Sequence, residues 1–321
     1  DGEELYQTRG LIFKQNGRYI VNQSDNWEQD SLKKVNWGNL YLMGTLGLEP
    51  LPISNAQVVQ QIGCPYAAKM MNISLDYPTN LWNKPFSKKG KISLYLRGCS
   101  FCDVARDKGF GIKLSLDAVL EQILLLPEGA EGKKIPFELI NEAPFPGLPG
   151  LLLNIKERGI RISQINLVTR ADWLVKSEDK LRDALNLAKS MEVRILLAEV
   201  GLESFANSIL ENLNKGYLVD TNLTAIKLMR QLKEEYPANF FYSRQDGAIH
   251  GFIHPTPWDT GDTKREMYAN ISIYDLEQDI LPASSIPLII HHASWLGDWA
   301  RELEKREGIK LERAGALIEW W

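Results

Sequence analysis

The cysteines are the residues of this sequence best suited to chemistry. Cys99 and Cys102 lie two residues apart, directly after the strand-like run 91–98, and the only other cysteine is Cys64. Two thiols at this spacing can bind one metal centre or form a redox-active pair. The sequence therefore predicts that this turn forms the floor of an active site.

Polar side chains also follow the other predicted strands. Because parallel strands gather their carboxyl ends on one face, these side chains are expected to lie together around a ligand. In chain order they are Asn141 and Glu142, Arg170 and Asp172, Glu199, Glu203 and Ser204, and His250 and His254.

Some of these residues have a second interpretation. Arg170 and Asp172 could pair with each other at the rim, although Arg170 also suits a carboxylate of a substrate or cofactor. His250 and His254 alternate with apolar residues, and they are either hydrogen-bonded core groups or proton-handling groups near substrate.

Short apolar runs separated by helix signals predict an α/β protein. Strands buried on both faces are nearly continuously apolar, and long connections between them require parallel pairing. We expect a partial (β/α) TIM-like barrel of parallel strands with an irregular N-terminal extension. The predicted strands are 92–96, 135–140, 164–168, 193–198 and 240–243, with a further one at 270–274 or 287–290, and the predicted helices begin after Ser115 and Ser177 and span 148–158 and 222–236.

The same pattern predicts three parts of the chain. Residues 1–60 read as a connector containing a hairpin that turns at Asn16-Gly17, because this dipeptide favours a tight β-turn. Residues 61–265 would form the barrel core, and residues 266–321 an extension that completes or covers it.

Composition narrows the classes of function. The 37 basic and 41 acidic residues give a net charge of −4, which argues against a nucleic-acid or anionic-membrane binder. No apolar run is long enough for a membrane span, and three cysteines do not form a secreted disulfide framework. We therefore expect a cytoplasmic protein.

The chain resembles the radical S-adenosylmethionine (SAM) superfamily over roughly residues 60–262. Two of the segments named above carry part of this resemblance. Cys99-Ser-Phe-Cys102 resembles the last part of the cluster-binding C-x3-C-x2-C motif of that family. Asn141-Glu142-Ala-Pro144 resembles the Gly-Gly-Glu-Pro turn that holds the SAM amino group.

Two later segments extend the resemblance. Gly201-Leu-Glu203-Ser204 is similar to the fourth-strand segment of the cobalamin-associated subgroup, where polar groups meet the ribose and carboxylate of SAM. The segment 247–251, which contains Ile249, is similar to the fifth-strand motif that packs on the adenine.

The first cysteine of the family motif is displaced. The family spacing would place it four residues before Cys99, where this chain has Tyr95. Cys64, in Gly63-Cys64-Pro65-Tyr66, resembles the opening of the motif in the cobalamin-associated subgroup. We hypothesise that an insertion separates the ligands, leaving 34 residues between Cys64 and Cys99.

The resemblance implies a cofactor set and a reaction. Three cysteines would bind a four-iron four-sulfur (4Fe-4S) cluster whose open iron chelates SAM, and an electron from a donor such as ferredoxin or flavodoxin would cleave SAM to a 5′-deoxyadenosyl radical. The sequence does not identify the substrate, which is a small molecule or of unknown class. The implied metal ligands are Cys64, Cys99 and Cys102, and the implied cofactor-binding residues are Asn141, Glu142, Arg170, Glu203, Ser204, Ile249 and His254.

Other interpretations stay open. Cys64 could be an ordinary buried thiol, which would make the chain a cluster-free SAM-binding or regulatory domain. A zinc site using His250 or His254, or a dithiol redox pair, is a third alternative. The first 30 residues resemble the connector that follows a cobalamin-binding domain, so the resemblance also leaves room for cobalamin in a longer parent protein.

Overall fold

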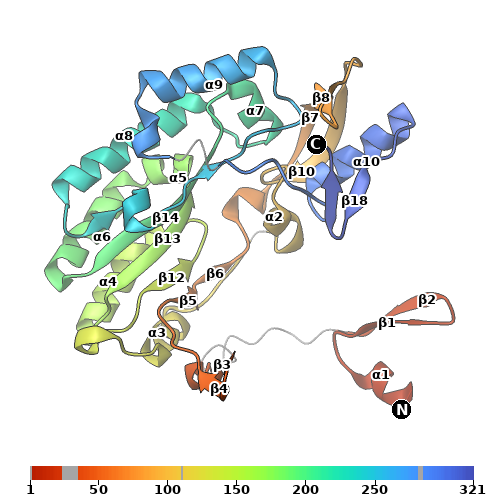
Figure 1. Ribbon diagram of the computed structural model, residues 1–321. Helices are drawn as coiled ribbons and strands as arrows, with labels where there is room; N and C mark the ends of the chain where they lie inside the picture. Colours follow the sequence, from red (N-terminus) through yellow and green to blue (C-terminus); the bar gives the residue numbers. More distant parts are fainter. Residues whose placement is uncertain (1, 24–34, 110, 281–284) are drawn as a thin grey trace.

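The centre of the protein is a parallel sheet. The computed structural model describes residues 2–23, 35–109, 111–280 and 285–321 (Figure 1). The strand order is β15-β14-β13-β12-β5, and β16 also pairs with β14. All of these pairs are parallel, which confirms the α/β class and a partial barrel. The strands are β5 (Ala56–Val59), β12 (Phe137–Ile140), β13 (Gln164–Arg170), β14 (Arg194–Glu203), β15 (Phe240–Phe241) and β16 (Gly251–Phe252).

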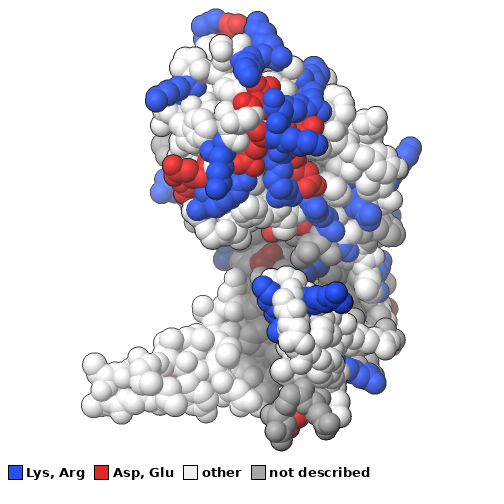
Figure 2. All heavy atoms as spheres, turned by 90° about the vertical axis from the view of Figure 1, so that its right-hand side faces the viewer, with Lys and Arg blue, Asp and Glu red and all other residues white. Residues whose placement is uncertain are grey.

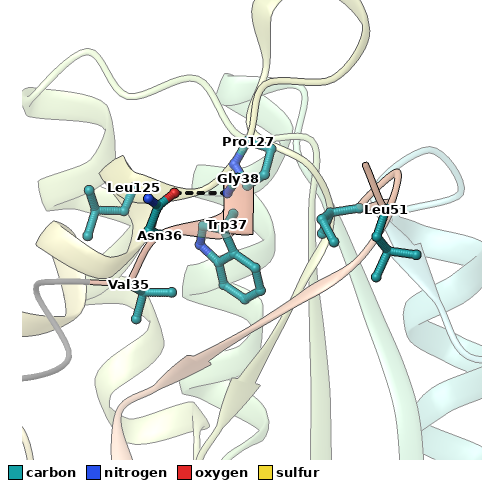
Figure 3. A pocket seen from close by; sticks show the side chains of 8 residues that line it. Val35, Asn36, Trp37, Gly38, Leu51, Leu125 and Pro127 are labelled. Carbon is teal, nitrogen blue, oxygen red and sulfur yellow. Dashed lines mark hydrogen bonds between the residues drawn. The ribbon is translucent and has the colours of Figure 1, made fainter. Parts of the chain in front are cut away.

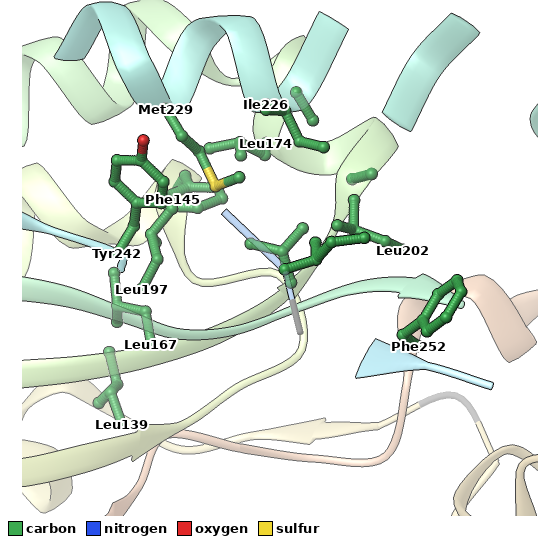
Figure 4. Packing of buried hydrophobic residues seen from close by; sticks show 14 of the residues in the cluster. Leu139, Phe145, Leu167, Leu174, Leu197, Leu202, Ile226, Met229, Tyr242 and Phe252 are labelled. Atoms are coloured by element: carbon green, nitrogen blue, oxygen red, sulfur yellow. The ribbon is translucent and has the colours of Figure 1, made fainter. Parts of the chain in front are cut away.

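Helices between these strands cover the sheet as the sequence pattern predicted. Leu139, Leu167 and Leu197 on adjacent strands belong to one buried cluster with Leu174 and Met229 from the helices (Figure 4). Burying a side chain of this size contributes about 1.5–3 kcal/mol, so this cluster holds the strands in place. The helices are α3 (Leu116–Leu125), α4 (Leu148–Glu157), α5 (Ala171–Lys176), α6 (Glu178–Met191), α7 (Asn207–Asn212) and α8 (Val219–Glu235).

The predicted strand at 92–96 exists, but its expected place as the first parallel strand was wrong. It is part of β10 (Lys91–Arg97), which pairs antiparallel with β7 (Met70–Asp76) outside the parallel sheet. Its burial alternates, with Ile92 buried and Tyr95 67% exposed, as expected for a strand with one solvent face. The first strand of the parallel sheet is instead β5, a short strand inside the range predicted as a connector.

The β7–β10 hairpin is anchored on a C-terminal helix, α10 (Trp295–Glu307), which contacts β10. Trp295 donates its indole N–H to the Arg97 carbonyl at 2.9 Å, and Lys88 pairs with Glu307. Figure 2 shows this face, where Lys and Arg side chains are interleaved with Asp and Glu over its upper part. The hairpin is therefore fixed to α10 by packing, by the Trp295 hydrogen bond and by the Lys88–Glu307 ion pair.

Two predictions near the C-terminus need correction. The segment 270–274 is not a strand, because it lies mostly in helix α9 (Gly261–Ile273), which Thr260 caps through its hydroxyl. Of the alternative at 287–290, only the end is a strand, β17 (Ile290–His291). It joins a small antiparallel sheet with β19 (Leu317–Glu319) and β18 (Glu312–Ala314), rather than the barrel.

The N-terminal hairpin is confirmed. Asn16 and Gly17 both have positive φ, and they connect β1 (Ile12–Gln15) to β2 (Arg18–Val21) (Figure 1). Within the described residues, no helix has the length and apolarity to cross a membrane. The remaining short elements are α1 (Gly2–Gln7), α2 (Asp103–Asp107), β3 (Tyr41–Gly44), β4 (Gly47–Pro50), β6 (Gln61–Ile62), β8 (Asn80–Leu81), β9 (Lys84–Pro85) and β11 (Ile112–Lys113), with 3-10 turns that include η3 (Pro65–Ala68).

Candidate functional site

The antiparallel hairpin folds the segment between the cysteines back on itself. Its register pairs Met70 with Arg97, so the two ends of the 34-residue segment between Cys64 and Cys99 lie close together. Cys64 stands at the start of η3, which contacts both β10 and α2, and these elements flank Cys99 and Cys102. None of the three thiols is in a disulfide. The fold thus brings residue 64 to the side of the C-x-x-C turn.

Two of the thiols, Cys64 and Cys102, lie in an environment that disfavours the charged thiolate. Burial raises the pKa of Cys64 to about 12, and the nearby charges of Glu142 and Cys99 add to this shift. Burial also raises the pKa of Cys102 to about 11, again with a contribution from Cys99. A bound metal would reverse this preference, because a coordinating thiol is deprotonated outright.

Arg170 connects the end of β13 to the cysteine turn. Its Nη1 donates to the Cys99 sulfur at 3.2 Å, and its Nε donates to Asp172 Oδ1 at 2.9 Å. The guanidinium also stacks on the ring of Tyr66, 3.9 Å from the centroid, and its Nη2 donates to the Lys215 carbonyl. Arg170 therefore does pair with Asp172, and at the same time it contacts a predicted metal ligand.

Glu203, at the end of β14, forms a buried ion pair. Its Oε1 lies 2.6 Å from Lys215 Nζ, with the side chains 9% and 2% exposed. A Cβ at Gly251 would lie 2.6 Å from the other carboxylate oxygen, so a larger residue there would displace the carboxylate. The carboxylate is fixed between a buried cation and the neighbouring strand β16.

Asn141 and Glu142 follow β12 at the same edge of the sheet. Asn141 is buried, donates to Gln60 Oε1 at 2.7 Å and accepts from the Ala143 amide at 2.9 Å. Burial raises the pKa of Glu142, while the cations Lys215 and Arg170 lower it. Since the charge of Glu142 also acts on Cys64 and Cys102, the residue lies close to the predicted cluster ligands.

The other predicted residues are placed differently. Ser204 is buried, and its hydroxyl accepts from the Ala206 amide at 3.2 Å, so it serves the turn before α7. Ile249 is 69% exposed on the loop before β16. The His254 ring is 3.0 Å from Asp259 Oδ2 and packs edge-on against Tyr268. The roles predicted for these three residues stay predictions.

His250 is a core group. It is buried, accepts from the Val200 amide at Nδ1 and lies 2.7 Å from the Tyr242 carbonyl through Nε2. Burial lowers its pKa, which favours the neutral ring.

The sequence reasoning missed two residues of the site, Lys215 and Tyr66. Lys215 is fully buried within a loop; it lies in the segment 212–216, which extends the resemblance after Glu203 and Ser204, but a lysine is seldom buried and it was not named as a site residue. Tyr66 lies against Gly216, where a Cβ would meet its hydroxyl at 2.4 Å. The one signal in the sequence is the glycine at 216 itself. Its φ is +72°, and glycine is expected where the backbone is left-handed and crowded.

A cavity of about 310 Å³ opens beside the C-x-x-C turn. Its lining combines polar and apolar side chains. The polar ones are Cys102, Asp103, Glu199, Glu203 and His291, and the apolar ones include Phe101, Phe252, Ile286 and Leu288. Burial, followed by the nearby charges of Glu203 and Glu142, raises the pKa of Glu199 from 4.5 to about 7, although part of this side chain faces the open cavity.

We expect this carboxyl to make stability depend on pH. Between pH 4.5 and about 7 the folded chain holds the Glu199 proton and the unfolded chain does not, so stability falls as the pH rises through this window. Urea unfolding of the wild type and Glu199→Gln at about pH 5 and about pH 8 checks this. The wild type should lose stability relative to the variant at the higher pH, and parallel pH profiles would contradict the assignment.

Gly98, which precedes the cysteine turn, is a second point of close packing. Its φ is +69°, and a Cβ would lie 2.5 Å from Cβ of Ala105 in α2. Gly308 has a similar φ of +63° but nothing within 4 Å, so it is a matched control. We expect Gly98→Ala to cost about 1–3 kcal/mol more than Gly308→Ala in urea unfolding, because overpacking adds to the backbone strain. Equal costs would show that the turn can move away from α2.

The three cysteines can be compared with what a 4Fe-4S cluster requires of its ligands. Among the described residues, no three His, Cys, Asp or Glu side chains are grouped closely enough to hold a single metal ion. A 4Fe-4S cluster makes a different demand, since its cysteines bind separate irons. Three free cysteines on adjoining elements, one of which, Cys102, lines the cavity, have the donor chemistry for such a cluster.

A larger cavity lies elsewhere. It has a volume of about 670 Å³ and is lined by Val35, Asn36, Trp37, Gly38, Leu51, Ile53, Leu125 and Pro127 (Figure 3). Ile53 precedes β5, so this cavity lies near the amino end of that strand, whereas Cys64 follows its carboxyl end. Its lining carries no titratable side chain, and the cysteine cavity is therefore the better candidate site.

Comparisons with known proteins give little further information. No protein-family model matches the chain, and no curated protein matches it. Among solved structures, the archaeal Methanocaldococcus infernus Elp3 with an N-terminus deletion is similar, with 18% identity and a TM-score of 0.32. The match covers 55% of this chain and 41% of the Elp3 chain. So loose a match carries no functional argument, and the case for function depends on the residues.

Proposed function

We propose that this chain binds a 4Fe-4S cluster and S-adenosylmethionine and acts as a radical SAM enzyme on a small-molecule substrate. One observation supports the proposal best. Strands β7 and β10 pair antiparallel, so the chain doubles back and Cys64 lies beside the turn that carries Cys99 and Cys102. The two parts of the proposed split motif are adjacent in the fold.

The cysteines would be the cluster ligands. When bound, a cluster held by three cysteines keeps one iron open for SAM and supplies the electron for its reductive cleavage. That electron would come from a donor protein such as ferredoxin or flavodoxin. The chain's own part is to hold the three sulfurs at the carboxyl edge of the sheet and to limit solvent around them.

Residues at neighbouring strand ends would bind SAM. Glu142 is half-buried near Cys64 and Cys102, a suitable position for the SAM amino group. Glu203 uses one carboxylate oxygen for Lys215, and its other oxygen approaches Gly251 beside the cavity, where it could meet the ribose. The apolar side chains in the cavity lining, which include Phe252 and Leu288, would suit the adenine or an apolar part of the substrate.

Anaerobic reconstitution tests the proposal. We expect about four irons and four sulfides per chain, a brown protein with a broad absorption band near 400 nm, and cleavage of SAM after reduction with dithionite. SAM binding by calorimetry without bound iron would instead favour the cluster-free alternative. Binding of neither iron nor SAM would refute both.

A further inference from the structure

The guanidinium of Arg170 is directed at one particular sulfur. It donates from Nη1 to Cys99 Sγ at 3.2 Å, and the residue is only 5% exposed. We propose that Arg170 is a positioning residue that keeps an N–H···S hydrogen bond on Cys99 and thereby raises the reduction potential of the cluster. This inference rests on the proposed function.

The surroundings of Arg170 hold it in this orientation. Nε donates to Asp172 at 2.9 Å, Nη2 donates to the Lys215 carbonyl, and the plane stacks on Tyr66 at 3.9 Å. All three nitrogens therefore have acceptors, and both ends of the guanidinium are fixed. Turning the group toward a SAM carboxylate would break these bonds, so the hydrogen bond to Cys99 is the role that the contacts favour.

The sign of the effect follows from charge. A cluster gains one negative charge when it is reduced, so a cation or an N–H donor at a ligand sulfur stabilises the reduced form and raises the potential. Asp172, which pairs with Arg170, acts in the opposite direction. Among the other charged groups near the site, Lys215 and Glu203 are paired with each other, whereas a charged Glu142 would act in the same direction as Asp172.

Two variants with opposite expected signs make the test specific. Arg170→Gln removes the cation and should shift the reduction equilibrium at least tenfold toward the oxidised cluster, about 59 mV lower for a one-electron couple. Asp172→Asn leaves the cation without its carboxylate and should raise the potential. Arg170→Lys keeps the positive charge but lacks the planar guanidinium that donates to several acceptors at once. Its reduction potential should lie between those of the wild type and Arg170→Gln.

The measurement is a redox titration of the reconstituted full chain, followed by electron paramagnetic resonance. The control is Arg182→Gln, which replaces an arginine that is also paired with carboxylates, those of Glu178 and Glu235. Its potential should equal that of the wild type.

Lower potentials for Arg170→Gln and higher ones for Asp172→Asn support the role. Unchanged potentials with intact clusters overturn it and leave the proposed function standing. Loss of the cluster in every Arg170 and Asp172 variant also overturns it, because the pair would then serve assembly rather than potential. A wild-type chain that takes up no iron overturns both proposals.

Discussion

A Cys64→Ala chain is expected to fold normally and to retain no more than about a tenth of the wild-type iron. Loss of an outer-shell partner already reduces metal affinity by about 10–100-fold, so loss of a direct ligand should cost at least as much. The side chain at residue 64 makes no capping hydrogen bond for η3, so the turn does not depend on it. Iron and sulfide quantitation after anaerobic reconstitution, together with circular dichroism, gives the comparison.

Tyr95 provides the matched control for that experiment. It occupies the position where the family spacing would place the first cysteine, but its side chain is 67% exposed on the solvent face of the hairpin. Adding Tyr95→Cys to Cys64→Ala should therefore not restore iron binding. Full iron content in Cys64→Ala would remove residue 64 from the ligand set, and rescue by Tyr95→Cys would show that the linear spacing, not the hairpin, places the ligand.

The second large effect is expected at Lys215. Replacing this lysine by methionine leaves Glu203 charged and buried without its partner, and breaking one side of a buried ion pair typically costs about 3–5 kcal/mol. Lys176 is a suitable comparison, because it also contacts a carboxylate, that of Asp172, but its side chain is 71% exposed. Lys176→Met should cost less than about 1 kcal/mol. Urea unfolding of the three proteins measures the difference.

A double variant separates the charge from the packing at this site. Lys215→Met combined with Glu203→Gln removes both charges, so it should be more stable than Lys215→Met alone. If the double variant is as unstable as the single one, the cost arises from lost packing of the lysine stem and not from the unpaired carboxylate. A small effect of Lys215→Met would show that Glu203 takes up a proton or reaches solvent.

Local sequence patterns were sufficient for the central strands of the parallel sheet. Strands β12, β13 and β14 were predicted because short, continuously apolar runs are typical of strands covered on both faces. Helix α3 was predicted from its apolar spacing and from Ser115, whose hydroxyl accepts from the Ala118 amide. The parallel order then places the residues after each strand at one edge, which is why Glu142 and Arg170 could be nominated from sequence.

Pairing partners and long-range contacts were decided only by the tertiary structure. The run 91–97 has the composition of a strand, but nothing local specifies that it pairs with 70–76, antiparallel and outside the barrel. That pairing is what brings Cys64 back to Cys99 across 34 residues. Lys215 and Tyr66 likewise become site residues only because distant backbone buries them against Glu203 and Arg170. Residue types and spacing determined which groups could do chemistry, whereas their meeting depends on register and burial, which are properties of the whole fold.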